Sequence, residues 1–325
     1  MTSPLLSIRD LQVDFETDAG RVPAVRGVDL DVEAGQTVAL VGESGSGKSV
    51  TALSVMRLMS GRVAGGHIDF RGKDLASLSE SEMRRIRGGQ IGMIFQEPMT
   101  SLNPVFKIGR QIEEVLALHQ QLAPTAARAQ ALELLKRVGI PSPETRLDQY
   151  PHELSGGMKQ RVMIAIAIAC RPALLIADEP TTALDVTIQA QIMVLLRSLQ
   201  QELGMAVLLI THDLGVVAHF AERVNVMYAG KIVEHGSVRD IFKRPAHPYT
   251  RALLGALPDP SARAQRLEAI PGRVPSPTQL PAGCAFCARC KHAFEPCAGK
   301  QPPLFEVATG HAAACWLHDA TLRRS

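Results

Sequence analysis

Residues 36–49 read QTVALVGESGSGKS and combine an apolar run, a glycine-rich turn and the polar start of a helix. The run Gln36–Gly42 predicts a buried strand, because it lacks the polar alternation of a half-exposed one. The turn Gly42–Ser49, here called the phosphate loop, fits the pattern G-x4-G-K-[ST] without a mismatch. Glycines let backbone amides fold around phosphate oxygens, and the next helix adds the positive end of its dipole. We therefore predict a phosphate site, the alternative being a purely structural turn.

Further buried-strand runs follow along the chain, and helical stretches separate them. The runs are 173–177, 206–210 and 224–227, and the helical stretches are 49–59 and 188–202. Strands that alternate with helices favour a mostly parallel sheet. Residues 5–15 and 24–32 instead alternate apolar and polar side chains, which is typical of antiparallel strands with one buried face. A hairpin with Ala229-Gly230 as its turn is expected after the last buried run.

A helical insertion is predicted at about residues 98–165, since the stretch 98–150 is rich in Leu, Ala and Gln and contains no buried-strand run. The predicted fold class is α/β, with a mixed sheet, an antiparallel β subdomain and this insertion. The chain has 325 residues, and a net charge of +3 with 4% aromatic residues does not indicate a nucleic-acid binder. Its longest apolar run, 162–170, is far short of the ~20 residues of a membrane span. Because the N-terminus also lacks the pattern of a signal peptide, we expect a cytosolic chain.

Charged and polar side chains follow the buried strands, where an open sheet binds its ligand. Lys48 would reach the β- and γ-phosphates of a nucleotide, and Ser49 would ligate magnesium. Asp178 would hold the magnesium through water and Glu179 would polarise the attacking water, unless the two charges simply mark a strand end. Gln96 and His212 also follow strands. Ser155-Gly156-Gly157 precedes a helix, as a plain N-cap or as a surface for the nucleotide of another molecule.

Six motifs in this order resemble the nucleotide-binding subunits of ABC transporters over about residues 5–250. They are the phosphate loop, Phe95-Gln96-Glu97, LSGGMKQR (154–161), LLIADEP (174–180), Ala183-Leu184-Asp185 and Thr211-His212-Asp213. The resemblance implies two subunits that close on two ATP molecules with Mg²⁺, the metal being bound by Ser49 and Gln96. The nucleotide-binding residues it implies are Phe15, Gly42, Glu43, Ser44, Gly45, Ser46, Gly47, Lys48, Ser49, Val50 and Asp178.

The same resemblance implies individual roles. Phe15 would stack on adenine, Glu179 would act as general base, and His212, Gln96 and Lys48 would complete the catalytic set. Gln96 would also face the membrane partner. Ser155, Gly156, Gly157 and Gln160 would contact the ATP of the partner subunit, and Asp185 would make a dimer contact.

Five of the six cysteines lie in the last 42 residues, after a segment with six prolines between 258 and 281. They are Cys284, Cys287, Cys290, Cys297 and Cys315. Four interpretations compete: disulfides, which are rare in the cytosol, unliganded thiols, a structural zinc ion and an iron–sulfur cluster. The cysteine spacing alone leaves the metal open.

Four further stretches are similar to the ATPases of oligopeptide, dipeptide and nickel permeases. They are HPYTRALLGALP (247–258), IPGRVPSP (270–277), QEPMTSLNP (96–104) and TTALDVT (181–187). The resemblance implies a nucleotide-binding domain at 1–257 and, at 258–325, a Pro- and Cys-rich extension of the oligopeptide-permease type. It also implies a [4Fe-4S] cluster on Cys284, Cys290, Cys297 and Cys315, with Cys287 as a substitute ligand.

The function that this resemblance implies is ATP hydrolysis that powers an importer of peptides or related solutes. The partners would be a second related ATP-binding subunit, two transmembrane permease subunits and an extracytoplasmic solute-binding protein, at the cytoplasmic face of the inner membrane. Two alternatives are a soluble ATPase of the same superfamily acting on ribosomes or DNA, and a redox-sensing regulator. The first usually has two ATPase halves or a long coiled coil, and the sequence has neither.

Overall fold

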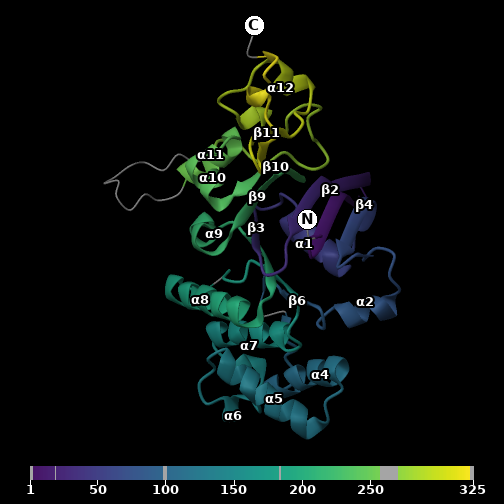
Figure 1. Ribbon diagram of the computed structural model, residues 1–325, viewed down its shortest axis with the longest axis vertical. Helices are drawn as coiled ribbons and strands as arrows, with labels where there is room; N and C mark the ends of the chain where they lie inside the picture. The colour runs from purple at the N-terminus through teal and green to yellow at the C-terminus, as the bar shows by residue number, and fades with distance from the viewer. Residues whose placement is uncertain (1–2, 19, 98–100, 183, 257–269, 323–325) are drawn as a thin grey trace. The chain divides into compact units, whose positions relative to one another are not determined.

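The computed structural model describes residues 3–18, 20–97, 101–182, 184–256 and 270–322 (Figure 1). The chain forms two compact units, each described here by itself. Unit 1 comprises Met1–Leu5, Val32–Gln36 and Ser77–Leu209, and unit 2 comprises Leu6–Asp31, Thr37–Ala76 and Ile210–Ser325. The predicted domain boundary at 257–258 lies outside the described residues, so it stays a prediction.

The first sheet of unit 2 is antiparallel and has the strand order β2-β1-β4-β5. Its strands are β1 (Leu6–Thr17), β2 (Gly20–Val32), β4 (Arg62–Phe70) and β5 (Lys73–Asp74). β1 pairs with β4 from Leu6 opposite Phe70 to Asp14 opposite Arg62. Leu6, Ile8, Leu11 and Val13 are fully buried, and the register shift between Arg9 and Gln12 lets both pairs face the core although their alternation is out of phase.

A second set of strands in unit 2 has the order β11-β12-β10-β9-β3. β3 (Thr37–Val41) is buried throughout and pairs in parallel with β9 (Arg223–Tyr228). β9 pairs antiparallel with β10 (Lys231–Ser237) through the predicted turn, in which Ala229 and Gly230 have φ angles of 46° and 82°. Positive φ at both central residues matches the twist of a two-residue hairpin. Parallel and antiparallel pairs therefore occur together, which confirms the mixed sheet.

The cysteine-rich extension adds two strands that the sequence analysis missed. β12 (His311–Ala313) pairs with β10, and β11 (Phe305–Ala308) pairs with β12 (Figure 1). Phe286 of the extension is 3% exposed and lies in the core cluster with Tyr228 and Tyr249. The extension is therefore packed into unit 2 and shares its core.

The α-helices of unit 2 follow its strands or belong to the extension. They are α1 (Lys48–Met56), α9 (Leu214–Phe220), α10 (Val238–Lys243), α11 (Pro248–Gly255) and α12 (Glu295–Gly299).

Unit 1 contains buried strands and most of the helices. β6 (Ile91–Ile94) pairs in parallel with β7 (Leu174–Asp178), and β8 (Ala206–Thr211), in which the unit boundary falls, neighbours β7. The helices are α2 (Glu80–Ile86), α4 (Ile108–Gln120), α5 (Pro124–Arg137), α6 (Pro143–Arg146), α7 (Gly156–Ile168) and α8 (Val186–Leu203). Between Ile108 and Ile168 the structure is helical, as the predicted insertion requires. Within the described ranges, none of the helices is long and apolar enough to cross a membrane.

A buried carboxylate connects three segments of unit 2. Glu234 in β10 is fully buried and accepts hydrogen bonds from the backbone amides of Ala246 and His247 at 2.7 and 2.8 Å. Nε2 of His311 in β12 lies 2.8 Å from Oε1 of the same carboxylate. His247 caps α11, because its Nδ1 accepts the backbone N–H of Tyr249 at 3.0 Å. The motif HPYT therefore starts a helix and anchors it to the sheet.

The free energy of unfolding should decrease as the pH is lowered, because His247 is buried in its neutral form. Burial, with a smaller contribution from the nearby His318, lowers the pKa of His247 to about 3. An unfolded chain protonates this histidine below about pH 6.5, so its stabilisation is present above that pH and falls by about 1.4 kcal/mol per unit of pH below it. Between pH 7.5 and 5.5, the free energy of unfolding should therefore drop by about 1.4 kcal/mol more in the wild type than in His247→Asn, whose amide oxygen caps without titrating. Equal losses in urea unfolding curves would contradict this assignment.

Candidate nucleotide site

The phosphate loop follows β3 and requires glycine at two positions. Gly42 has φ 155°, and a side chain there would place Cβ 2.2 Å from the carbonyl oxygen of Met227. Gly47 has φ 104°, and its Cβ would lie 2.7 Å from the carbonyl oxygen of Ala24. Real Cβ atoms do not approach backbone so closely, and a positive φ also favours glycine. The loop therefore has the close backbone packing that the motif predicts.

Lys48 is the first residue of α1 and is 5% exposed. Its Nζ donates to the carbonyl oxygens of Gly42 and Glu43 at 2.8 and 2.9 Å. The ammonium group is thus held inside the loop, beside the amino end of a nine-residue helix. Both the charge and the helix dipole favour an anion there.

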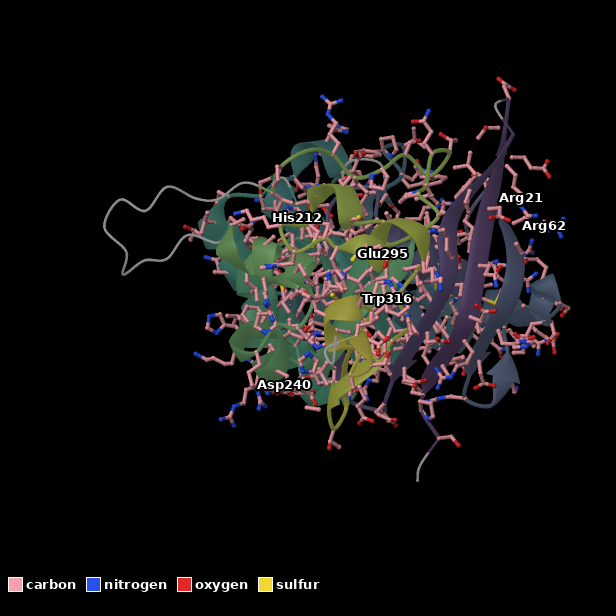
Figure 2. All side chains as sticks on the ribbon, turned by 90° about the horizontal axis from the view of Figure 1, so that it is seen from above. Arg21, Arg62, His212, Asp240, Glu295 and Trp316 are labelled. Atoms are coloured by element: carbon pink, nitrogen blue, oxygen red, sulfur yellow. The ribbon has the colours of Figure 1, made fainter. Side chains whose placement is uncertain are left out.

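Phe15, the expected adenine-stacking residue, lies near the end of β1 and is half-buried. A Cβ at Gly61 would meet the Phe15 ring at 3.0 Å, so this glycine lets the loop before β4 approach the ring. Arg21 bonds to Asp14, and Arg62 is paired with Asp14 across the sheet; Figure 2 shows both arginines at the same edge. A half-exposed aromatic ring can stack on a base.

His212 follows β8 and is exposed (Figure 2). The next residue, Asp213, accepts the amides of Gly215 and Val216 at 2.8 and 3.1 Å and so caps α9. The cap fixes where the helix begins and thereby where His212 leaves the strand.

In unit 1, Asp178 ends β7 and is 4% exposed, and Glu179 follows with φ 47°. Gln96 donates to Oε2 of Glu179 at 3.1 Å, and Oγ1 of Thr182 donates to the same oxygen at 2.8 Å. A positive φ in a residue with a long side chain is uncommon and is found where the structure constrains the backbone. The structure therefore brings together the predicted base and the predicted switch residue. Thr182 was not predicted to have a role of its own.

The predicted signature residues lie at the amino end of α7. Ser155 caps this helix through a hydrogen bond from the amide of Met158 at 3.4 Å, and Asp185 caps α8 through that of Ile188 at 2.9 Å. A Cβ at Gly157 would lie 3.0 Å from Cγ2 of Ile188, so the two helix starts meet in close contact. Gln160 is 1% exposed, and its Nε2 has no hydrogen-bond partner among the described residues.

The predicted residues fall into two sets. Phe15, residues 42–50, His212 and the cysteines of the extension belong to unit 2. Gln96, Ser155, Gly156, Gly157, Gln160, Asp178, Glu179 and Asp185 belong to unit 1. Within each set the geometry is as described above.

Two cysteines of the extension are joined through their backbones. The amide of Cys284 donates to the carbonyl oxygen of Cys297 at 2.8 Å, and a Cβ at Gly283 would lie 2.2 Å from that oxygen. Burial, with smaller contributions from the nearby Cys297, Cys315 and Cys290, raises the pKa of the Cys284 thiol to about 11. Across the described residues, no group of three or more His, Cys, Asp or Glu side chains is placed to hold a metal ion. The four-cysteine site therefore stays a prediction.

One connection between the extension and the phosphate loop was not anticipated. Arg289, which lies between Cys287 and Cys290, forms an ion pair with Glu43 of the loop. The two residues are 246 positions apart, so local sequence carries no signal of the contact.

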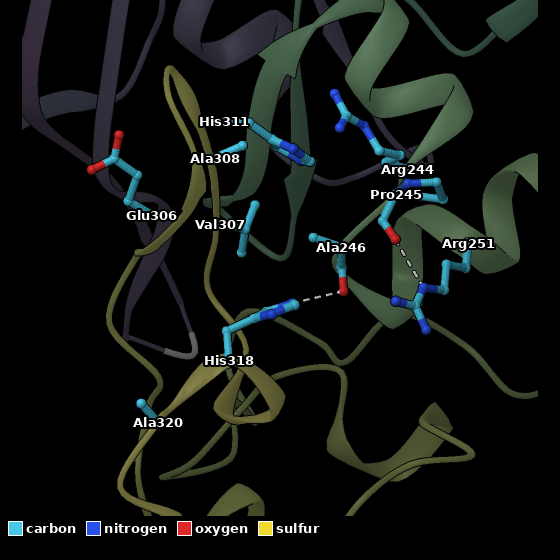
Figure 3. Close-up of a pocket in the computed structure, with 10 residues that line it drawn as sticks. All are labelled: Arg244, Pro245, Ala246, Arg251, Glu306, Val307, Ala308, His311, His318 and Ala320. Carbon is cyan, nitrogen blue, oxygen red and sulfur yellow. Dashed lines mark hydrogen bonds between the residues drawn. The ribbon is translucent and has the colours of Figure 1, made fainter. Parts of the chain in front are cut away.

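Unit 2 also contains a cavity of about 500 Å³ (Figure 3). It is lined by Arg244, Pro245, Ala246, Arg251, Glu306, Val307, Ala308, His311, His318 and Ala320. Nε2 of His318 lies 3.1 Å from the carbonyl oxygen of Ala246, and Nε of Arg251 donates to that of Pro245 at 2.9 Å. Its lining contains none of the residues predicted for the nucleotide.

Two family models match the chain. The ABC transporter model matches residues 25–182, and the model of the C-terminal region of oligopeptide/dipeptide transporters matches residues 233–297. The oligopeptide transport ATP-binding protein OppD of Bacillus subtilis is 53% identical over 317 residues, covering 96% of this chain and 88% of that protein. A peptide ABC transporter ATP-binding protein of Sinorhizobium fredii is 54% identical over 316 residues, covering 96% of this chain and 94% of that protein.

Solved structures agree with these matches. The ATP-binding cassette MJ0796, in a dimeric post-hydrolysis state bound to ADP and Pi, superposes with a TM-score of 0.66 and 29% identity. The match covers 72% of this chain and 99% of that one. The chain thus resembles the two peptide-transport ATP-binding proteins over 96% of its length. The chain belongs to the ATP-binding subunits of ABC transporters, in the oligopeptide/dipeptide branch, and is an ATPase of that family.

Proposed function

We propose that the chain energises the import of di- or oligopeptides, or of related solutes, across the cytoplasmic membrane. The observation that carries the proposal is the match of residues 233–297 to the C-terminal region of oligopeptide/dipeptide transporters. Relatives covering 96% of the chain carry peptide transport in their names. Within unit 2, Phe286 of this region belongs to the core cluster that contains Tyr228 and Tyr249.

For hydrolysis, we propose that the phosphate loop binds the nucleotide phosphates, with Lys48 as their cation and Ser49 as a magnesium ligand. Gln96 would be the second magnesium ligand and would report the γ-phosphate to the membrane partner. Magnesium bound there would offset the negative charge of the phosphates. Glu179 would orient and deprotonate the attacking water, held by its hydrogen bonds from Gln96 and Thr182.

The complex we propose has two ATP-binding subunits, this chain and a related one, on two transmembrane permease subunits with an extracytoplasmic solute-binding protein. The signature residues would bind the ATP of the partner subunit. Ser155 and Gly156 are exposed at the start of α7, which supports a role of this helix end in binding an anion of another molecule. The complex would lie at the cytoplasmic face of the inner membrane.

Copurification tests the complex. Tagged Glu179→Gln should bind ATP and hydrolyse it slowly, which keeps the closed assembly together. We expect mass spectrometry of the material isolated from native membranes with ATP to find two multi-span permease subunits and a second ATPase. The untagged strain controls for background. Recovery of ribosomal proteins or nucleic acid, or of no membrane protein, would overturn the proposal.

We further propose that Cys284, Cys290, Cys297 and Cys315 hold a [4Fe-4S] cluster, which needs four thiolates. The hydrogen bond from the amide of Cys284 to the carbonyl oxygen of Cys297 brings two of these four residues together. Protein purified without oxygen should contain about four iron atoms per chain and absorb broadly near 400 nm. Cys297→Ser should lose both signals, and Cys170→Ser, outside the extension, should keep them. Stoichiometric zinc, or protein without iron, would contradict the cluster.

A further inference from the structure

A single arginine joins the extension to the phosphate loop within unit 2. Arg289 ends the short turn Cys287–Arg289, and its side chain is 6% exposed. Its Nη1 donates to Oε1 of Glu43 at 3.0 Å and its Nη2 donates to Oε2 at 3.1 Å. Two parallel hydrogen bonds to one carboxylate are the strongest geometry for such a pair. The pair is mostly shielded from water, since the Glu43 side chain is only 29% exposed.

The guanidinium is held from its other sides as well. Its Nε donates to the carbonyl oxygen of Pro271 at 2.8 Å, and Nη1 also donates to Oη of Tyr228 at 3.2 Å. The rings of Tyr228 and Phe286 lie 5.8 and 5.9 Å from its Cζ. An arginine held in this way has one orientation. Its fork, the two donors Nη1 and Nη2, therefore binds Glu43 with little further loss of side-chain entropy.

Glu43 is also fixed along its main chain. Its amide donates to Oη of Tyr249 at 2.9 Å, and its carbonyl oxygen accepts from Nζ of Lys48 at 2.9 Å. Arg289, Tyr249 and Lys48 therefore meet at one residue of the loop. Two of these three contacts come from segments that follow residue 247, at the other end of the chain.

A carboxylate within this loop has a consequence for anion binding. Nucleoside triphosphates carry several negative charges, and an uncompensated Glu43 carboxylate would repel them over a few ångströms. The Arg289 guanidinium neutralises this carboxylate where water screens charges poorly. With Arg289 in place, the field at the loop is set by Lys48 and the helix dipole.

We propose that Arg289 is a positioning residue of the nucleotide site: it neutralises Glu43 and holds the phosphate loop in shape, so that the cysteine-rich extension contributes to ATP affinity. This inference rests on the proposed binding of ATP by the phosphate loop. Arg289 acts through Glu43 and does not itself contact the nucleotide.

The test measures equilibrium binding of a fluorescent ATP analogue to the full-length chain. Arg289→Gln should weaken binding about tenfold, equivalent to about 1.4 kcal/mol, because the Glu43 charge is left uncompensated. The double variant Glu43→Gln with Arg289→Gln removes both charges and should bind at least about threefold more tightly than Arg289→Gln. Arg289→Lys keeps the charge but loses the fork, and should weaken binding about threefold.

Charge rescue separates this role from a purely structural one. If Arg289 only anchored the extension, the double variant would bind as weakly as Arg289→Gln or more weakly, and the inference would be wrong. Circular dichroism checks that each variant is folded, and Arg289→Lys keeps the inference testable if Arg289→Gln does not fold. Unchanged binding in Arg289→Lys would then overturn it. Arg273→Gln, an exposed arginine of the same extension, is the matched control and should bind as the wild type does.

A second control distinguishes this inference from the proposed nucleotide site. Lys48→Ala should abolish detectable binding. If Lys48→Ala binds normally, the proposed site is wrong and the inference falls with it. If Lys48→Ala loses binding while Arg289→Gln retains it, only the role of Arg289 is overturned.

Discussion

Glu179→Gln should lower the rate of ATP hydrolysis about a thousandfold, within the ~10²–10⁴ that a positioned general base contributes. An amide cannot take a proton from water, although it has nearly the same shape as the carboxylate. The hydrogen bond that Gln96 donates to Oε2 of Glu179 at 3.1 Å can be retained by the amide oxygen. Nucleotide affinity should therefore stay within about twofold of the wild type. The loss of activity is then confined to the chemical step.

Thr182→Val perturbs the same carboxylate and should have a smaller effect on hydrolysis than Glu179→Gln. Thr182 donates to the same carboxylate oxygen at 2.8 Å, so its loss leaves the base in place but less firmly oriented. Hydrolysis should fall about three- to tenfold, because one hydrogen bond to a charged group contributes about 1–3 kcal/mol, only part of it felt in the transition state. Single-turnover rates measure the chemical step and equilibrium affinities measure nucleotide binding, so together they show which of the two is lost.

If Glu179→Gln keeps more than about a tenth of the wild-type activity, Glu179 is not the general base.

Glu234→Ala should destabilise unit 2 by about 3–5 kcal/mol, as expected for removal of one partner from a buried charged network. The substitution leaves two backbone amides, those of Ala246 and His247, without the acceptors that now lie at 2.7 and 2.8 Å. It also removes the partner of His311, at 2.8 Å in β12. The start of α11 and the edge formed by β12 should loosen together, since both depend on this carboxylate.

Denaturant unfolding followed by circular dichroism would measure the loss, with Glu306→Ala as the matched control. Glu306 lies in β11 of the same extension and is exposed, so its replacement should cost less than about 0.5 kcal/mol. Glu234→Gln should fall between the two, because its amide oxygen can accept from one backbone amide while its amino group faces the other. Equal stability of Glu234→Ala and the control would show that the network does not hold the extension.

Local patterns predicted the elements whose form depends on neighbouring residues. The phosphate loop is one example: Gly42 and Gly47 adopt positive φ, and the helix begins at Lys48 as the motif requires. The cap at Ser155 is another, because its hydroxyl accepts from an amide three residues ahead. β11 and β12 were missed because they are short, at four and three residues, and become strands only by pairing with an edge already present.

By itself, the sequence determined that this protein has a strand, a phosphate loop and a helix in succession, the motifs of an ABC ATPase, and a cysteine-rich end. These features depend on backbone preference and on residues a few positions apart. Only the tertiary structure decided that Arg289 meets Glu43 and that Glu234 joins β10, α11 and β12. Such contacts depend on which surfaces pack when the whole unit folds, because burial selects partners across hundreds of residues and leaves no local pattern to predict them.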